Sequence, residues 1–174
     1  IEENAIAFSS LGSTQLLPTA KIVIGGSSTT PNETIVVSND GGSTWITTAT
    51  SVLFDSGVLG VGYNGEIYVA VGGENNTIAY SYDTETWFGL GNTFFAGNFG
   101  NSVVWNGSIW VAVGDNTSDA VYYSSNGISW TGVDVSSLLP GGNGMLNKVI
   151  WTGTHFIAVG INATNDIIYS SNGI

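Results

Sequence analysis

Carboxylates are the most numerous side chains in this sequence that could carry acid–base chemistry. The chain has 13 Asp and Glu residues but only one histidine and no cysteine. A pair of carboxylates can hydrolyse a glycosidic bond when one acts as acid and the other as base or nucleophile. A glycoside hydrolase acting on a neutral sugar is therefore one alternative, although most acids fall in expected loops, where solvated carboxylates are usual. The candidates are Glu66, Glu74, Glu85, Asp115, Asp119 and Asp166.

Other catalytic and metal chemistry finds little support. His155 is the single histidine, and it aligns with Ile67 and Ile109 inside an expected strand, which predicts a packed or edge-facing residue. Without cysteine, zinc thiolate sites, disulfides and thiol nucleophiles are excluded. No G-x-S-x-G motif occurs. We expect no catalytic residue, no metal and no cofactor.

The charge balance excludes several partners. Lys21 and Lys148 are the only basic residues apart from His155, and the formal net charge is −11. Nucleic-acid affinity comes mainly from Lys and Arg on phosphates, so we expect no nucleic-acid binding.

No apolar run approaches the roughly 20 residues that span a bilayer, so we expect no membrane insertion.

The elements that must position these residues form a repeat. Ser38, Ser81, Ser124 and Ser170 begin similar phrases and fall 43, 43 and 46 residues apart. A second phrase lies upstream of each, as in VVWNGSIWVAVGD and VIWTGTHFIAVGI. We predict one repeat array over 1–174, with units at roughly 1–50, 51–94, 95–138 and 139–174, which could be part of a longer protein.

Each unit has strand periodicity. Short runs rich in Val, Ile, Tyr and Trp alternate with polar residues, and Gly and Asn separate the runs. Asn64-Gly65 and Asn106-Gly107 predict two-residue hairpins in which both residues adopt positive φ. No helical period persists, so we expect no helix. Four antiparallel strands per unit predict an all-β β-propeller with about four four-stranded blades, the last incomplete in this chain.

The phrase SNDGGSTW resembles the Asp-box of sialidase-like propellers, also called the bacterial neuraminidase repeat. That resemblance implies a structural turn on the outer side of each blade, away from a catalytic face. We expect the indole to lie at the contact between blades. Sialidases bind their carboxylated sugar with arginines, which this chain lacks, so we expect a non-catalytic member. The matching positions are Ser38, Asp40, Gly42, Thr44 and Trp45, then Ser81, Asp83, Thr86 and Trp87, then Ser124, Asn126, Ser129 and Trp130.

The loops between the second and third strands and the connections between units should share one face of a propeller. This face combines amides and carboxylates with aromatic rings, which suits a neutral carbohydrate or a protein surface. The alternative is that these are ordinary turn residues and buried loop anchors. The candidate ligand face comprises Asn75, Asn76, Phe94, Phe95, Phe99, Asp115, Asn116, Asp119, Asn165 and Asp166.

Five N-x-[ST] sequons predict glycosylation if the chain passes through a secretory route. They begin at Asn32, Asn75, Asn106, Asn116 and Asn162. With the polar, acidic composition they favour an extracellular or particle-surface location.

The incomplete last unit raises the question of closure. The first residues, IEENAIAF, could complete the last blade or form the first strand of unit 1. An unclosed array leaves strand edges that could pair between chains. The leading hypothesis is a non-enzymatic surface module that binds a glycan or protein, and the main alternative is a structural subunit that self-associates through unpaired strand edges.

Overall fold

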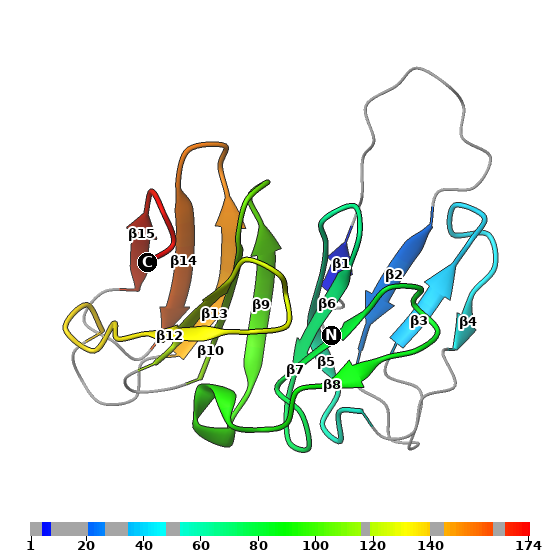
Figure 1. Cartoon of the computed structure of the whole chain (residues 1–174), viewed down its shortest axis with the longest axis horizontal. Helices are drawn as coiled ribbons and strands as arrows, with labels where there is room; N and C mark the ends of the chain where they lie inside the picture. The colour runs from blue at the N-terminus through cyan, green and yellow to red at the C-terminus, as the bar shows by residue number, and fades with distance from the viewer. Residues whose placement is uncertain are drawn as a thin grey trace.

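A computed structural model describes residues 5–7, 21–26, 35–47, 53–115, 119–139, 145–161 and 166–174. The strands in these ranges form four antiparallel sheets that stand side by side (Figure 1). This confirms the prediction of an all-β, propeller-like architecture with about four blades.

Each sheet is a meander, in which strands adjacent in sequence are also neighbours in space. Blade 4 has three strands among the described residues, as expected for an incomplete last blade. Blade 1 contains β1 (Ala5–Ala7), β2 (Ile22–Gly25), β3 (Ile35–Ser38) and β4 (Ile46–Thr47). Blade 2 contains β5 (Val58–Tyr63), β6 (Tyr68–Gly72), β7 (Ile78–Ser81) and β8 (Phe88–Gly89). Blade 3 contains β9 (Gly100–Trp105), β10 (Trp110–Gly114), β11 (Val121–Ser124) and β12 (Thr131–Val133). Blade 4 contains β13 (Met145–Trp151), β14 (Phe156–Ile161) and β15 (Ile167–Ser170).

The first strand of each blade is the innermost one. β1 lies beside β5, β5 beside β9, and β9 beside β13. The strand β1 pairs with β2 in register Ala5↔Gly25, so the N-terminal segment forms the first strand of blade 1 and, of the two alternatives, does not complete blade 4.

The pairing between the second and third strands has the same register in all four blades. The serine that begins each repeated phrase pairs with the first residue of the second strand of its blade. The pairs are Ile22↔Ser38, Tyr68↔Ser81, Trp110↔Ser124 and Phe156↔Ser170. Positions counted from these pairs are equivalent between blades.

Apolar clusters join successive blades. One cluster contains Val23 of blade 1 and Ala70 of blade 2, a second contains Val69 of blade 2 and Ala112 of blade 3, and a third contains Val111 of blade 3 and Ala158 of blade 4. Since side chains alternate along a strand, each inner blade buries both faces. All five residues of β6 and of β10 are buried, which explains the uninterrupted apolar sequences YVAVG and WVAVG.

The hairpins differ from the predicted two-residue turns. In the hairpin that contains Asn64-Gly65, Tyr63 pairs with Tyr68, so four residues connect β5 and β6. Gly65 has a φ of 100°, but Asn64 is not among the residues with positive φ. Instead, Asn64 Oδ1 accepts hydrogen bonds from the backbone N–H groups of Glu66 and Ile67. The asparagine therefore caps the turn with its side chain, and only the glycine needs the left-handed backbone.

The prediction that no helix forms is also corrected. A short 3-10 helix spans Phe94–Gly97 between blades 2 and 3. Its residues Phe95 and Ala96 have φ values of 54° and 53°, a region that non-glycine residues rarely occupy. The Phe95 ring is fully buried, so tertiary packing holds a turn that no local pattern predicts.

Candidate functional site

The Trp turns, which we define as residues 38–45, 81–87 and 124–130, share one hydrogen-bond scheme that is clearest in the second. Ser81 Oγ donates to Asp83 Oδ1 at 3.0 Å and accepts from the Thr84 backbone N–H at 2.9 Å. Asp83 Oδ1 also accepts from the Thr86 N–H at 2.7 Å. Trp87 Nε1 donates to the Thr84 carbonyl oxygen at 3.1 Å. The serine and aspartate thus satisfy the backbone of the turn, and the indole closes it.

The other turns repeat these contacts. Asn126 replaces the aspartate in the third turn, and its Oδ1 accepts from the Ser129 N–H at 2.9 Å. A fourth, shorter copy follows β15, where Ser170 Oγ accepts from the Gly173 N–H at 2.9 Å. The indoles of Trp45 and Trp130 donate to the Gly42 and Gly127 carbonyls at 3.1 Å.

The turn aspartates are held ionised. Hydrogen bonds from the side chain and backbone of Thr44, together with Ser38, lower the pKa of Asp40 to about 2. Backbone hydrogen bonds from Thr86 and Glu85 lower the pKa of Asp83 to about 2. A general acid or base works best with a pKa near the operating pH, so these carboxylates suit a structural role.

The indoles differ in burial because of their neighbours. Trp87 is 7% exposed within the cluster between blades 1 and 2, and Trp130 is half-buried against the cluster between blades 2 and 3. Each therefore packs toward the preceding blade. Trp45 belongs to blade 1, which no described blade precedes, and it is 42% exposed.

Aromatic residues predicted for a ligand face are packed inside the fold. Phe95 is fully buried and lies 4.8 Å from the Tyr122 ring centroid, so it cannot stack on a ligand. Phe94 is half-buried, 5.5 Å from the same ring. The half-buried Phe99 lies over Gly73, where a Cβ atom would meet its ring at 2.2 Å. These rings anchor the connection between β8 and β9.

Two polar candidates also hold connections together. Asn76 Nδ2 donates to the Leu53 carbonyl at 2.7 Å, and its Oδ1 accepts from the Gly91 N–H at 2.8 Å. Asp115 Oδ1 accepts from Asn101 Nδ2 at 2.5 Å. Burial raises the pKa of Asp115, and the hydrogen bond from Asn101 opposes that rise. Asn76 and Asp115 therefore form hydrogen bonds that stabilise the fold.

The remaining described candidates differ in their exposure. Asn75 and Asp166 are exposed, and Asp119 is half-buried. The sequon residue Asn106 lies in the hairpin between β9 and β10, where its Oδ1 accepts from the Ile109 N–H. Outside the described residues lie Asn32, Asn116, Asn162 and Asn165.

In the described part of the chain, no group of three or more His, Asp or Glu side chains is placed to hold a metal ion. His155 is an exposed turn residue just before β14, and not a strand residue as its alignment predicts. Its backbone N–H donates to Thr152 Oγ1 at 3.0 Å. Within the same ranges, no helix is long and apolar enough to cross a membrane.

A polar cavity of about 220 Å³ lies between the β5–β6 hairpin and the third Trp turn. Tyr82 is exposed beside it. In the sequence, only its position in the Trp turn distinguishes this residue, because the other copies have Asn39, Ser125 and Ser171 there. The cavity is lined by Asn64, Glu66, Ile67, Tyr82, Ser125, Asn126 and Ile128.

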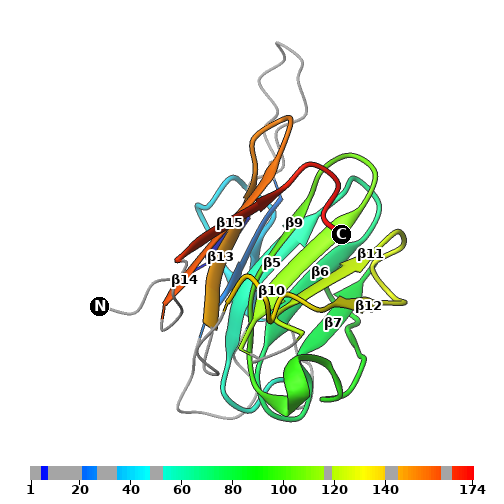
Figure 2. The ribbon, with the colours of Figure 1, turned by 90° about the vertical axis from the view of Figure 1, so that its left-hand side faces the viewer.

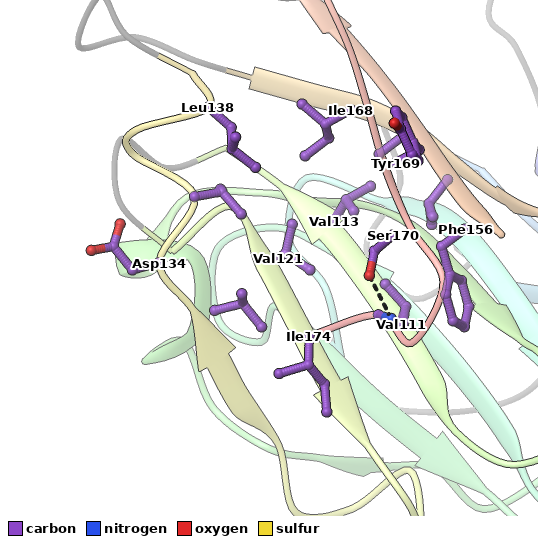
Figure 3. A pocket seen from close by; sticks show the side chains of 15 residues that line it. Val111, Val113, Val121, Asp134, Leu138, Phe156, Ile168, Tyr169, Ser170 and Ile174 are labelled. Atoms are coloured by element: carbon purple, nitrogen blue, oxygen red, sulfur yellow. Dashed lines mark hydrogen bonds between the residues drawn. The ribbon is translucent and has the colours of Figure 1, made fainter.

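An apolar cavity of about 260 Å³ lies between blades 3 and 4 (Figure 3). Val111, Val113 and Val121 line it from blade 3. Phe156 and Ile168 line it from blade 4.

The side of blade 4 that faces away from blade 3 is apolar and uncovered. In Figure 2, β13, β14 and β15 lie to the left of β10, β11 and β12, so the side of blade 4 that faces away from blade 3 points to the left of this view. Tyr169 is 76% exposed. We call this surface the open face of blade 4, and it comprises Ile150, Val159, Ile167 and Tyr169.

Comparison with known proteins supports the fold. A GH74 enzyme from Niastella koreensis is similar to this chain with a TM-score of 0.67 and 16% sequence identity. The match covers 98% of this chain and 29% of that protein, so the chain spans less than a third of its length. No protein-family model and no curated protein match the chain. The fold and its repeated sheets define a β-propeller-type protein, and a likeness at this identity carries no activity with it.

Proposed function

We propose that the chain is a non-enzymatic β-propeller module, of the Asp-box kind, that assembles with a second copy of itself. Blade 1 of one copy stacks on the open face of blade 4 of the other. This contact would repeat the packing between blades that occurs three times inside the chain.

The observation that carries the proposal is the burial of equivalent positions. Ile78 in blade 2 and Val121 in blade 3 are buried by the blade that follows, whereas their equivalent Ile167 is 64% exposed in blade 4. The complementary surface is on blade 1, where the exposed Trp45 is equivalent to the packed Trp87. Contiguous exposed apolar patches on soluble proteins commonly mark interaction sites.

Such a contact joins two different surfaces and is therefore heterologous, so it forms a ring or an open polymer. The net charge of −11 opposes association through repulsion between copies. Salt screens that repulsion, so self-association should strengthen as the salt concentration rises. The acidic, arginine-free composition and the sequons support an extracellular or particle-surface location.

The test is the molar mass in solution, measured by light scattering against protein and salt concentration. The wild-type chain should grow in mass with both, and the double variant Ile167→Ser, Tyr169→Ser should remain monomeric. Leu59→Ser removes an exposed apolar side chain from β5 and serves as the matched control. A wild-type chain that stays monomeric throughout, or an equal loss with Leu59→Ser, would overturn the proposal.

A second candidate function is carbohydrate binding at the polar cavity, as the sequence suggests for a different surface. Tyr82 offers an exposed ring beside Glu66 and Asn64, and sugars combine stacking on aromatic rings with hydrogen bonds to polar groups. Binding on a glycan array that is lost in Tyr82→Ala and kept in Tyr169→Ala would support it. Equal signals for both variants would exclude it.

A further inference from the structure

The apolar cavity between blades 3 and 4 corresponds to the place where the inner blades seat a tryptophan. In blade 3, Trp130 packs against the cluster between blades 2 and 3. That cluster includes Val69, Val71, Ile78, Leu90, Trp110 and Tyr122. One blade further on, the equivalent positions are Val111, Val113, Val121, Val133, Phe156 and Ile168, and all six line the cavity.

The turn beside the cavity has the geometry of the complete Trp turns. Gly173 has a φ of 77°, and its equivalents Gly127 and Thr84 both have a φ of 74°. A Cβ atom on Gly127 would lie 3.0 Å from Val69 and 3.2 Å from Trp110. A Cβ atom on Gly173 would lie 2.7 Å from Val111 and 3.1 Å from Phe156, which are the equivalent residues.

The edge of β15 beside the cavity corresponds to the edge of β11 that pairs with β12 in blade 3. In blade 3, Val121, Tyr122 and Tyr123 of β11 pair with β12, the strand that directly follows Trp130. The equivalent residues of β15 are Ile167, Ile168 and Tyr169, and among the described residues β15 pairs only with β14. An unpaired strand edge is a template for another strand.

We infer that the cavity and the edge of β15 together form a binding site for an extended strand that carries a tryptophan. The strand pairs antiparallel with β15, and its indole enters the cavity and donates Nε1–H to the Gly173 carbonyl. Trp45, Trp87 and Trp130 make this bond to Gly42, Thr84 and Gly127. The cavity volume of about 260 Å³ lies below the roughly 300–1,000 Å³ of pockets for drug-sized ligands, which suits one side chain.

The cavity lies on the side of blade 4 that faces blade 3, whereas the assembly surface is the opposite side. The two sites share the strand β15, including Tyr169, so the test below separates them by protein concentration. Its ligand is a peptide, and the chain itself supplies the model sequence, Ile128–Val133 (ISWTGV).

The experiment appends Ser-Trp-Thr-Gly-Val to the full chain after Ile174 and measures urea unfolding. Two control extensions are Ser-Ala-Thr-Gly-Val and Trp-Ser-Thr-Gly-Val. The second has the same composition but moves the tryptophan by one residue, which turns its side chain to the opposite face of the strand. Each variant is measured at low protein concentration, where self-association is absent.

The extension with tryptophan in register should lower the unfolding equilibrium constant about tenfold or more relative to both controls, because the indole binds only the folded state. It should also slow hydrogen exchange of the β15 amides. Equal stability of the three extended chains would overturn the inference. Equal stabilisation by the in-register and the shifted tryptophan would also overturn the inference, because it would show non-specific apolar contact and no specific binding of the indole in the cavity.

Discussion

Val113 in β10 and Val159 in β14 occupy the same position in successive blades, yet Val113 is 0% exposed and Val159 is 39% exposed. Both lie in the phrase AVG. Val113 belongs to the cluster between blades 3 and 4, and Val159 follows Ala158, which belongs to the same cluster from blade 4, so alternation places Val159 on the side of blade 4 that faces away from blade 3. Blade 4 covers Val113, whereas no described blade covers Val159.

Substitution of these two valines should have different costs. Val113→Ser removes a fully buried side chain and introduces a hydroxyl between blades 3 and 4, which should lower the free energy of unfolding by about 2–4 kcal/mol. Val159→Ser should stay within about 0.5 kcal/mol, as substitutions at partly exposed positions usually do. Urea unfolding of dilute protein measures both. Equal losses would mean that the two valines share one environment.

Acid should weaken the Trp turns. The folded pKa of Asp83 is about 2, against an ordinary value of 3.8, so the unfolded state binds the proton more readily between these values. The contribution of Asp83 to stability is therefore present above its unfolded pKa and is lost as the pH falls toward about 2.

Asp83→Asn tests this directly, because Asn126 already fills the same position in the third turn without a titrating group. The variant should fold, and its urea midpoint should fall less steeply with decreasing pH than that of the wild type. An unchanged pH dependence would contradict the role assigned to the Asp83 carboxylate.

Trp110 and Trp87 should respond differently to replacement by phenylalanine. Within the described residues, the buried Trp110 Nε1 has no hydrogen-bond partner, and phenylalanine already stands at the equivalent Phe156. Trp87→Phe also removes the hydrogen bond to the Thr84 carbonyl. We expect Trp87→Phe to cost about 1–2 kcal/mol more than Trp110→Phe. Thermal or urea unfolding would reveal the difference, and a larger cost for Trp110→Phe would contradict it.

Thr84 and Gly127 are equivalent residues with the same left-handed backbone. In Thr84→Gly, relief of strain offsets the loss of a small buried side chain, so the free energy of unfolding should change by about 1 kcal/mol or less. Gly127→Thr adds strain and places a Cβ atom 3.0 Å from Val69, so it should cost about 2 kcal/mol or more. Comparison of the two urea midpoints checks this asymmetry. Similar costs would show that the turns tolerate side chains equally.

Local features of this fold could be predicted from the sequence. The strand content and the uptake of turn N–H groups by Ser81 and Asp83 depend on residues within a few positions of one another. The four-part repeat is visible as similar phrases that recur every 43 to 46 residues. The hairpin at Asn64 was predicted at the right place with the wrong geometry, because an Asn-Gly pair is compatible with more than one turn and the side-chain cap decides between them.

The candidate ligand face could be predicted from the sequence much less well. Phe95 and Asn76 have the composition of a ligand face, but packing against Tyr122 and hydrogen bonds to Leu53 and Gly91 use them within the fold. Those partners are distant in sequence, so no local pattern identifies them. The cavity beside Tyr82 and the apolar cavity also combine residues that are distant in sequence, so no local pattern identifies them either.

By itself, the sequence determined the repeat, its strands and the chemistry of its turns, since each follows from short-range hydrogen bonding and alternation of side chains. Only the tertiary structure decided which equivalent residues are covered. Burial of Val113 and exposure of Val159 depend on whether another sheet stands beside the strand. The phrase AVG is identical in both blades, so it does not predict this difference.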